Sequence, residues 1–308
     1  MTDNSEIWGI VYVPKAGVNN SQKRWNQIRE YLEFRKVKFD FVQSDQSASV
    51  ERLTRLLIDS GHRTIVVVGG DEALNDAINA IMFTPREIRK TLYLGIVPNG
   101  IGNDFADFWG LHTDEYKKAI HWIIEHRSRT IDVGYCSFRE DNEQKVRYFL
   151  MAVNIGLGAQ AIRLSDICKR WGKINPSYLW AIYKLFKERK QYKMRFRLNS
   201  EEVSEKIMTL CIGNSRGYGL TPSAVPYNGW LDVSQVQRPK GWQTFRGLYL
   251  LLHNQFLNYE QVKPYRTKQV EIYQAEGSMT CLDGRTLIHT FPLTVSLEPG
   301  AVNFIIPG

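Results

Sequence analysis

The sequence predicts an α/β protein whose first part folds around a parallel sheet and whose second part is rich in antiparallel strands. Up to about residue 127, short apolar runs alternate with segments of helical periodicity. This is the pattern of a parallel sheet that is covered on both faces. Beyond residue 128, strand-like segments follow one another with turn residues between them, as in antiparallel sheets.

The elements of the first part follow from hydrophobic periodicity. The predicted strands lie at 6–13, 37–42, 64–68 and 93–97, and the predicted helices lie after the first strand, at 49–60, after Asp71 and at 114–127. The first helix places Trp25, Ile28 and Leu32 on one face. Gly61 follows the second helix, which is typical of a helix C-terminus.

The second part reads as a series of strands without a linker or an internal repeat. The predicted segments are 129–138, 146–156, 193–199, 205–215, 230–237, 268–275, 279–288 and 291–308. The change from alternating helices and strands to strands alone places a domain boundary near residue 130.

The most informative run is TIVVVGGDEALNDAINAIM, residues 64–82, in which a buried strand leads through two glycines and Asp71 into a helix. Glycines in such a turn allow a phosphate to approach backbone N–H groups, and the helix N-terminus favours its negative charge. A second strand end of this kind follows at 98–104, and two such turns can line one ligand site. The pattern predicts a nucleotide-binding site. The alternative is that Asp71 and Asp104 only cap helices.

Composition is that of a folded protein without a signal peptide. The N-terminus is acidic and then strand-like, and no run approaches the roughly 20 apolar residues of a membrane-spanning helix. The four cysteines lack the spacing of a zinc site or of a disulfide framework. We therefore expect a cytoplasmic protein that is soluble or peripheral at the inner face of the membrane.

Positive charge is concentrated in one segment. Residues 163–197 carry eleven Lys and Arg residues against two acids, a net +9, whereas the whole chain carries +8. Aromatic residues are interleaved with these cations, which suits an anionic membrane surface. We expect contact with lipid headgroups through Lys184, Lys187, Arg189 and Lys190. A helix packed by its aromatic face is the alternative, and no nucleic-acid partner is expected because no known module accompanies the segment.

Five motifs occur along the chain: GGDEALND at 69–76, PNGIGNDFA at 98–106, ID at 131–132, NGWLDV at 228–233 and LDGR at 282–285. Together they resemble the diacylglycerol kinase catalytic family, which includes bacterial lipid kinases and the sphingosine kinases. Single motifs of this kind are weak evidence, but five in the family's order are strong. The resemblance implies a nucleotide domain related to NAD kinase and phosphofructokinase at 1–130, a β-rich lipid domain at 131–292, and a last strand at 293–308 that returns to the first domain.

The resemblance also implies ATP and Mg²⁺ as cofactors and a lipid hydroxyl, of diacylglycerol or a sphingoid base, as the phosphate acceptor. The ATP would bind between the two domains. By resemblance, Asp71 is the catalytic carboxylate of the first motif and Asp232 is a metal ligand. The positions that correspond to nucleotide contacts are Gly69, Gly70, Glu72, Asn75, Asn99, Gly100, Gly102, Asn103 and Asp104.

Two motifs depart from the family's usual residues. Glu72 and Ala73 replace the Gly and Thr of GGDGT, and a carboxylate in a phosphate-binding turn repels the ligand. Arg285 replaces the Glu of a DGE motif, and a guanidinium cannot accept a proton at neutral pH. We therefore expect weak or absent catalysis, with Glu72 and Arg285 paired as a salt bridge that plugs the site. Asn228 and Asp107 stand where the family has Asp and Arg, which weakens the case for a structural Mg²⁺ site.

Two other interpretations stay open, and a third is rejected. Glu72 could act as the base, or Arg285 could neutralise phosphate, and the chain would then be an active lipid kinase. A regulatory protein that binds a lipid or a nucleotide without catalysis is the alternative from another class. Diguanylate cyclases share the letters GGDE, but their motif continues with Phe on a hairpin, whereas here Ala73 follows and a helix begins.

Overall fold

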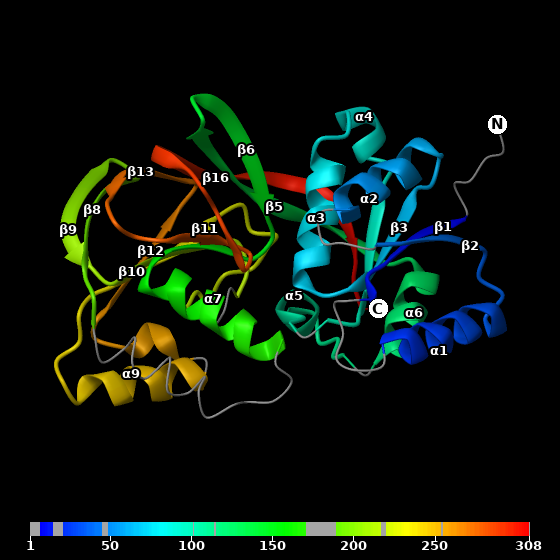
Figure 1. Ribbon diagram of the computed structural model, residues 1–308, viewed down its shortest axis with the longest axis horizontal. Helices are drawn as coiled ribbons and strands as arrows, with labels where there is room; N and C mark the ends of the chain where they lie inside the picture. Colours follow the sequence, from blue (N-terminus) through cyan, green and yellow to red (C-terminus); the bar gives the residue numbers. More distant parts are fainter. Residues whose placement is uncertain are drawn as a thin grey trace. The chain divides into compact units, whose positions relative to one another are not determined.

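The computed structural model describes residues 7–14, 21–44, 49–100, 102–113, 115–170, 189–216, 220–253 and 255–307. The chain forms two compact units, one of residues 1–131 with 300–308 and the other of residues 132–299 (Figure 1). The domain boundaries predicted from the sequence lie between residues 130 and 131 and between residues 292 and 293.

The first unit is built on a parallel sheet with the strand order β2-β1-β3-β4-β16. Its strands are β1 (Trp8–Tyr12), β2 (Phe39–Gln43), β3 (Thr64–Gly69), β4 (Tyr93–Pro98) and the end of β16 (Thr290–Ile305). The central strands β1 and β3 are buried at every position, because helices cover both faces of the sheet. This burial explains why these strands are continuous apolar runs rather than alternating ones.

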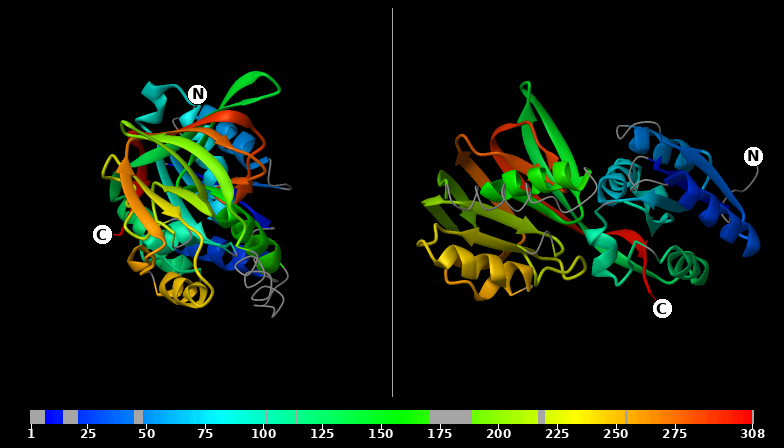
Figure 2. Two further views of the ribbon diagram at one scale, coloured as in Figure 1. Left: turned by 90° about the vertical axis from the view of Figure 1, so that its left-hand side faces the viewer. Right: turned by 60° about the horizontal axis from the view of Figure 1, so that its bottom comes forward.

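Six helices of the first unit are described. They are α1 (Ser21–Phe34), α2 (Ser49–Asp59), α3 (Asp71–Met82), α4 (Arg86–Arg89), α5 (Asp104–Phe108) and α6 (Tyr116–Glu125). The helices α2 and α3 contact each other, as do α1 and α6, and the two pairs lie on opposite faces of the sheet (Figure 2). The parallel-sheet prediction is confirmed. The helix α4 was not predicted, and α5 was expected only in the alternative that Asp104 caps a helix, because elements of four and five residues are too short to show a periodic pattern.

The second unit is a sandwich of two antiparallel sheets. One sheet continues from β16 through β13, β8 and β9, with β5 pairing both β16 and β6, and the other has the order β12-β11-β10-β7-β14-β15. The strands are β5 (Ser128–Glu140), β6 (Glu143–Phe149), β7 (Ala152–Gly156), β8 (Tyr192–Leu198), β9 (Glu201–Ile207), β10 (Thr209–Gly213), β11 (Leu231–Val236), β12 (Val262–Thr267), β13 (Gln269–Ala275), β14 (Thr280–Leu282) and β15 (Arg285–Thr286). Residues from both sheets, such as Phe196 and Val233, share one buried core.

Three predicted strands of this part are wrong as single elements. The segment 279–288 forms the hairpin of β14 and β15, and the other two segments lie where the chain changes sheets. The segment 146–156 forms β6 and β7, and the segment 205–215 contains the end of β9 and all of β10. In both cases the chain passes from one sheet to the other at the break. The sequence stays apolar across each break because both sheets contribute to the same core, so periodicity alone gives no sign of the change.

Helical elements also occur in the second unit. They are α7 (Leu157–Arg170), α9 (Gln243–Leu252) and the short 3₁₀ helix η3 (Phe256–Asn258). The helix α7 contacts β7, β10 and β14, whereas α9 packs through Leu250 against Val236, Phe256 and Tyr259. Among the described helices, none is both long enough and apolar enough to cross a membrane.

Candidate functional site

The turns after β3 and β4 lie directly against each other. The backbone N–H of Asp71 donates to the Gly102 carbonyl at 3.1 Å. A Cβ atom on Gly100 would lie 2.4 Å from the Cα atom of Gly70, which is closer than real Cβ contacts allow. Glycine is therefore required at this contact, and the structure brings together the two turns that the sequence predicts to line one site.

We expect Gly100→Ala to lower the free energy of unfolding by about 1–3 kcal/mol, the usual cost of forcing an atom into a packed region. The added methyl meets backbone on the facing turn, so the turns must separate, and ATP affinity should fall as well. Urea unfolding and calorimetric titration with ATP measure the two effects. The matched control is Gly241→Ala, since no atom of a described residue lies within 4 Å of a Cβ atom there. A Gly100→Ala variant as stable as the control would contradict the close packing.

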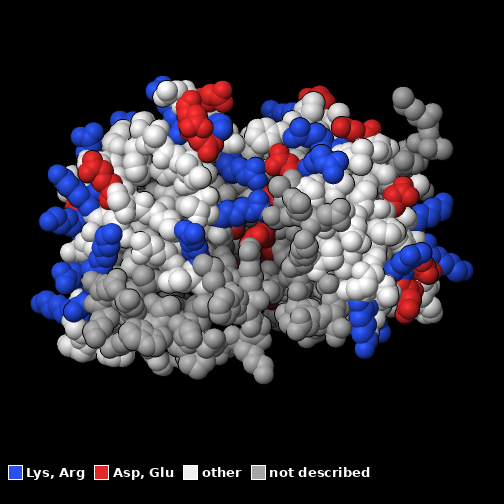
Figure 3. All heavy atoms as spheres, in the orientation of Figure 1, with Lys and Arg blue, Asp and Glu red and all other residues white. Residues whose placement is uncertain are grey.

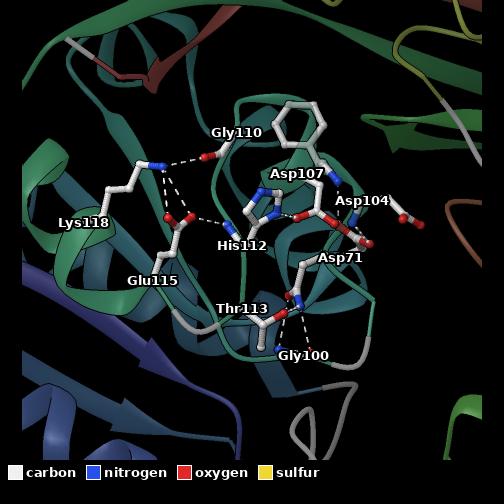
Figure 4. A network of polar contacts seen from close by, with 11 residues as sticks. Asp71, Gly100, Asp104, Asp107, Gly110, His112, Thr113, Glu115 and Lys118 are labelled. Carbon is white, nitrogen blue, oxygen red and sulfur yellow. Dashed lines mark hydrogen bonds and ion pairs between the residues drawn. The ribbon is translucent and has the colours of Figure 1, made fainter.

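The carboxylate of Asp71 fixes the start of α5. Its Oδ2 accepts a hydrogen bond from the backbone N–H of Asp104 at 2.8 Å, and its Oδ1 accepts one from that of Phe105 at 3.1 Å (Figure 4). These are among the N–H groups that a helix leaves without an internal partner. Asp71 thus joins the first turn to the second, which supports a positioning role. The catalytic role given to Asp71 stays a prediction.

Two asparagines complete the turns. The Asn103 amide donates to the Gly100 carbonyl at 2.8 Å and to Thr113 Oγ1 at 2.9 Å, and its Oδ1 accepts from the Gly100 N–H at 3.2 Å. Asn99 is 4% exposed, and its amide nitrogen has no hydrogen-bond partner among the described residues. A buried donor of this kind, beside two glycine turns, fits a ligand that brings an acceptor oxygen.

A second group of polar contacts holds the segment that follows α5. His112 Nδ1 lies 2.8 Å from Asp107 Oδ1, and Glu115 accepts from the His112 N–H at 2.9 Å and from Lys118 Nζ at 3.2 Å (Figure 4). The His112 N–H and then Lys118 hold the pKa of Glu115 below its ordinary value. Sequence reasoning missed Thr113, His112, Glu115 and Lys118, because no motif or periodicity marks them.

Two further residues of α3, Asn75 and Glu72, were predicted to contact the nucleotide. Asn75 is fully buried, and Asn79 Nδ2 donates to its carbonyl oxygen at 2.8 Å. It therefore lies within the packing of the helix. Glu72 is partly buried in the first turn of α3, where a negative charge also stabilises the helix. Nucleotide contact by either residue stays a prediction.

In the second unit, the LDGR motif forms a tight hairpin between β14 and β15. Asp283 and Gly284 have φ angles of 43° and 87°, as a two-residue type I′ turn requires. The Asp283 carboxylate is buried and accepts hydrogen bonds from the backbone N–H groups of Leu150, Met151 and Ala152 at 2.7, 3.0 and 2.9 Å. Arg285 is the first residue after this turn.

Models of two known protein domains match the two parts of the chain. Residues 8–136 match the model of the diacylglycerol kinase catalytic domain. Residues 151–306 match the model of the YegS C-terminal NAD kinase beta sandwich-like domain. The chain belongs to the diacylglycerol kinase family of lipid kinases. The resemblance drawn from the five motifs is confirmed.

Individual members of this family match most of the chain. A diacylglycerol kinase of Mycobacterium tuberculosis is 23% identical over 261 residues, which are 81% of this chain and 79% of that protein. A YegS-like lipid kinase of Pseudomonas syringae is 28% identical over 274 residues, covering 85% and 82%. A crystal structure of a diacylglycerol kinase from Bacillus anthracis superimposes with a TM-score of 0.71, 16% identity and coverage of 98% and 97%. Yeast NADH kinase has a TM-score of 0.55 at 8% identity, so these two structures support the fold alone.

Two aspartates of the family motifs in the second unit form hydrogen bonds with other residues of that unit. Asp232, expected as a metal ligand, accepts hydrogen bonds from Ser223 Oγ at 2.6 Å and Arg266 Nε at 2.8 Å. Asp132 accepts one from the Gly229 N–H at 2.6 Å. The described residues contain no group of three or more His, Cys, Asp or Glu side chains that could hold a metal ion. The metal role of Asp232 stays a prediction.

The basic residues expected to contact a membrane are only partly among the described residues. Lys184 and Lys187 lie outside the described residues. Arg189 donates to the Pro239 carbonyl at 3.3 Å, and Lys190 Nζ lies 5.1 Å from the centre of the Tyr192 ring. Figure 3 shows Lys and Arg side chains along the left-hand margin, over β8 and β9.

Proposed function

We propose that this lipid kinase homologue transfers phosphate from ATP to a lipid hydroxyl only at a strongly reduced rate. The observation that carries the proposal is the hairpin after Leu282. Its two-residue turn sets the position of the next side chain, and that side chain is the guanidinium of Arg285. A general base contributes about 10²–10⁴-fold to such a rate, and Arg285 cannot act as one.

The turns of the first unit support nucleotide binding. The close approach of Gly70 and Gly100 leaves backbone rather than side chains at the ends of two parallel strands, and Asn99 offers a buried donor that has no partner among the described residues. Bound ATP would supply the transferred phosphoryl group, and Mg²⁺ would neutralise its charge. Asp71 would hold α5 and the two turns in register, because both of its oxygens accept backbone N–H groups.

A regulatory protein that binds a nucleotide or a lipid is the second candidate, and Glu72 favours it. This carboxylate stands in the first turn of α3, where it opposes the approach of a phosphate. Glu72 belongs to the first unit and Arg285 to the second, and their pairing as a plug stays a prediction. In either role, we propose diacylglycerol or a sphingoid base as the lipid and an anionic membrane as the surface on which the protein meets it.

The test is transfer of labelled phosphate from ATP to a lipid extract that contains diacylglycerol and sphingoid bases. We expect the folded protein to form product far more slowly than the rate of about 1–100 s⁻¹ that is common for kinases. Binding of ATP is measured in parallel by calorimetry. A rate within the common range would establish an active enzyme with a different base and would overturn the proposal.

A further inference from the structure

The helix α9 and its N-cap residue Trp242 present aromatic side chains to solvent along one face. Trp242, Phe245 and Tyr249 are 70%, 67% and 58% exposed. Their spacing of three and four residues places them on the same side of a helix. Single exposed apolar residues are normal on a protein surface, but three large rings in one row form a patch of the kind that marks an interaction site.

The opposite face of α9 is firmly packed, so the orientation of the helix is fixed. Leu250 is buried in a cluster with Val236, Phe256, Tyr259 and Val262. The Tyr259 hydroxyl donates to the Gln243 carbonyl at 2.9 Å. A Cβ atom on Gly247 would lie 2.7 Å from the Tyr259 ring, which shows how closely the helix approaches its neighbour. The exposed rings therefore cannot turn inward without breaking this packing.

Cations lie beside the N-terminal end of the aromatic row. Arg238 and Lys240 are exposed just before the helix, and within the described part of the chain neither side chain has an ion-pair partner. Arg189 donates to the carbonyl of Pro239, which brings the basic residues 189–190 to the same loop. Arg246, on the exposed side of α9, pairs with Glu260 at 2.7 Å. The loop at the N-terminal end of the aromatic row is thus predominantly positive.

We propose that Trp242, Phe245 and Tyr249, with Arg238 and Lys240, dock the protein on an anionic lipid bilayer. Trp and Tyr rings, each with one polar group, partition to the depth of the headgroups. The Phe ring adds apolar area that the interface can bury, and Lys and Arg beside the rings bind lipid phosphate. A helix of ten residues is about 15 Å long, too short to cross a bilayer, so α9 lies in the plane of the interface. The choice of a membrane as partner rests on the proposed lipid function, whereas binding to vesicles does not require phosphate transfer.

The test is sedimentation of the full chain with vesicles of phosphatidylglycerol and phosphatidylcholine, without ATP. The variant carries Trp242→Gln, Phe245→Gln and Tyr249→Gln, which keep helix-forming side chains on α9. The matched control carries Phe34→Gln and Phe83→Gln, which remove exposed rings from the first unit (77% and 51% exposed). We expect about tenfold or greater loss of vesicle affinity in the α9 variant, since binding scales with buried apolar area, and no loss in the control. Binding should also fall with added salt.

A second measurement locates the helix directly. Trp242→Phe keeps an aromatic ring at the first position, so vesicle binding should persist. Quenching of tryptophan fluorescence by lipids with brominated acyl chains should fall if Trp242 is the inserted ring. A phosphate-transfer rate within the common range of kinases, with unchanged vesicle binding, would count against the proposed function but not against docking. Equal vesicle binding by the α9 variant and the control would overturn the docking proposal, as would a concentration-dependent dimer that only the α9 variant abolishes.

Discussion

Replacing Arg285 by Glu is expected to raise the rate of phosphate transfer to a lipid hydroxyl by about 10²–10⁴-fold, the usual contribution of a general base. Arg285 pairs with Leu282 across a two-residue turn, so the new side chain leaves the hairpin from the same position. A carboxylate there can accept the hydroxyl proton, which a guanidinium cannot do. The rate is measured with labelled ATP and a lipid extract that contains diacylglycerol and sphingoid bases.

The control for this prediction is Arg285→Gln, which removes the positive charge without supplying a base. We expect little gain from it. A rise equal to that of Arg285→Glu would mean that the guanidinium inhibits by its charge or bulk, and the general-base explanation would be rejected.

The double variant Glu72→Gly with Arg285→Glu separates nucleotide binding from proton transfer. Glu72 is partly exposed, so solvent screens its repulsion of a phosphate, and we expect ATP affinity to rise only by about fivefold, which is near 1 kcal/mol. Unchanged ATP affinity in the double variant would eliminate the idea that Glu72 and Arg285 together plug the site.

Replacing Asp283 by Ala is expected to lower the free energy of unfolding by about 3–5 kcal/mol. Three buried backbone N–H groups, those of Leu150, Met151 and Ala152, donate to this carboxylate. Each donor left without a partner costs about 1–3 kcal/mol, and local relaxation recovers part of the sum. Urea unfolding followed by circular dichroism and tryptophan fluorescence measures the loss.

Asp283→Asn is the matched variant for this second prediction. It keeps one acceptor oxygen and the φ preference that the turn needs, so it should lose clearly less stability than Asp283→Ala. If the two variants were equally stable, the hydrogen bonds of the carboxylate would not be what stabilises the junction between β6 and β7.

The strands of the first unit could be predicted because β1, β3 and β4 are buried and each is a short apolar run bounded by turns. The same reasoning failed at 146–156 and 205–215. There the chain changes sheets, but both halves of each segment face the same core. The hydrophobicity of a segment indicates that it is buried, but it does not indicate to which sheet the segment belongs.

At the candidate site, the motifs identified Asp71 and the two glycine turns but not the contacts they make. The spacing of Gly70 and Gly100 in the sequence is thirty residues, and only the folded sheet places their backbones against each other. His112 and Glu115 belong to no motif, so their part in holding the segment after α5 was found only in the structure.

By itself, the sequence determined the family, the parallel sheet and the substitutions at positions 72 and 285, because these depend on local periodicity and on the identity of single residues. Only the tertiary structure decided what Asp283 binds, since its donors lie 131–133 residues away along the chain. It also decided which side of α9 is exposed. The helix carries large apolar residues on more than one face, and burial of one face rather than another is set by the neighbours it packs against.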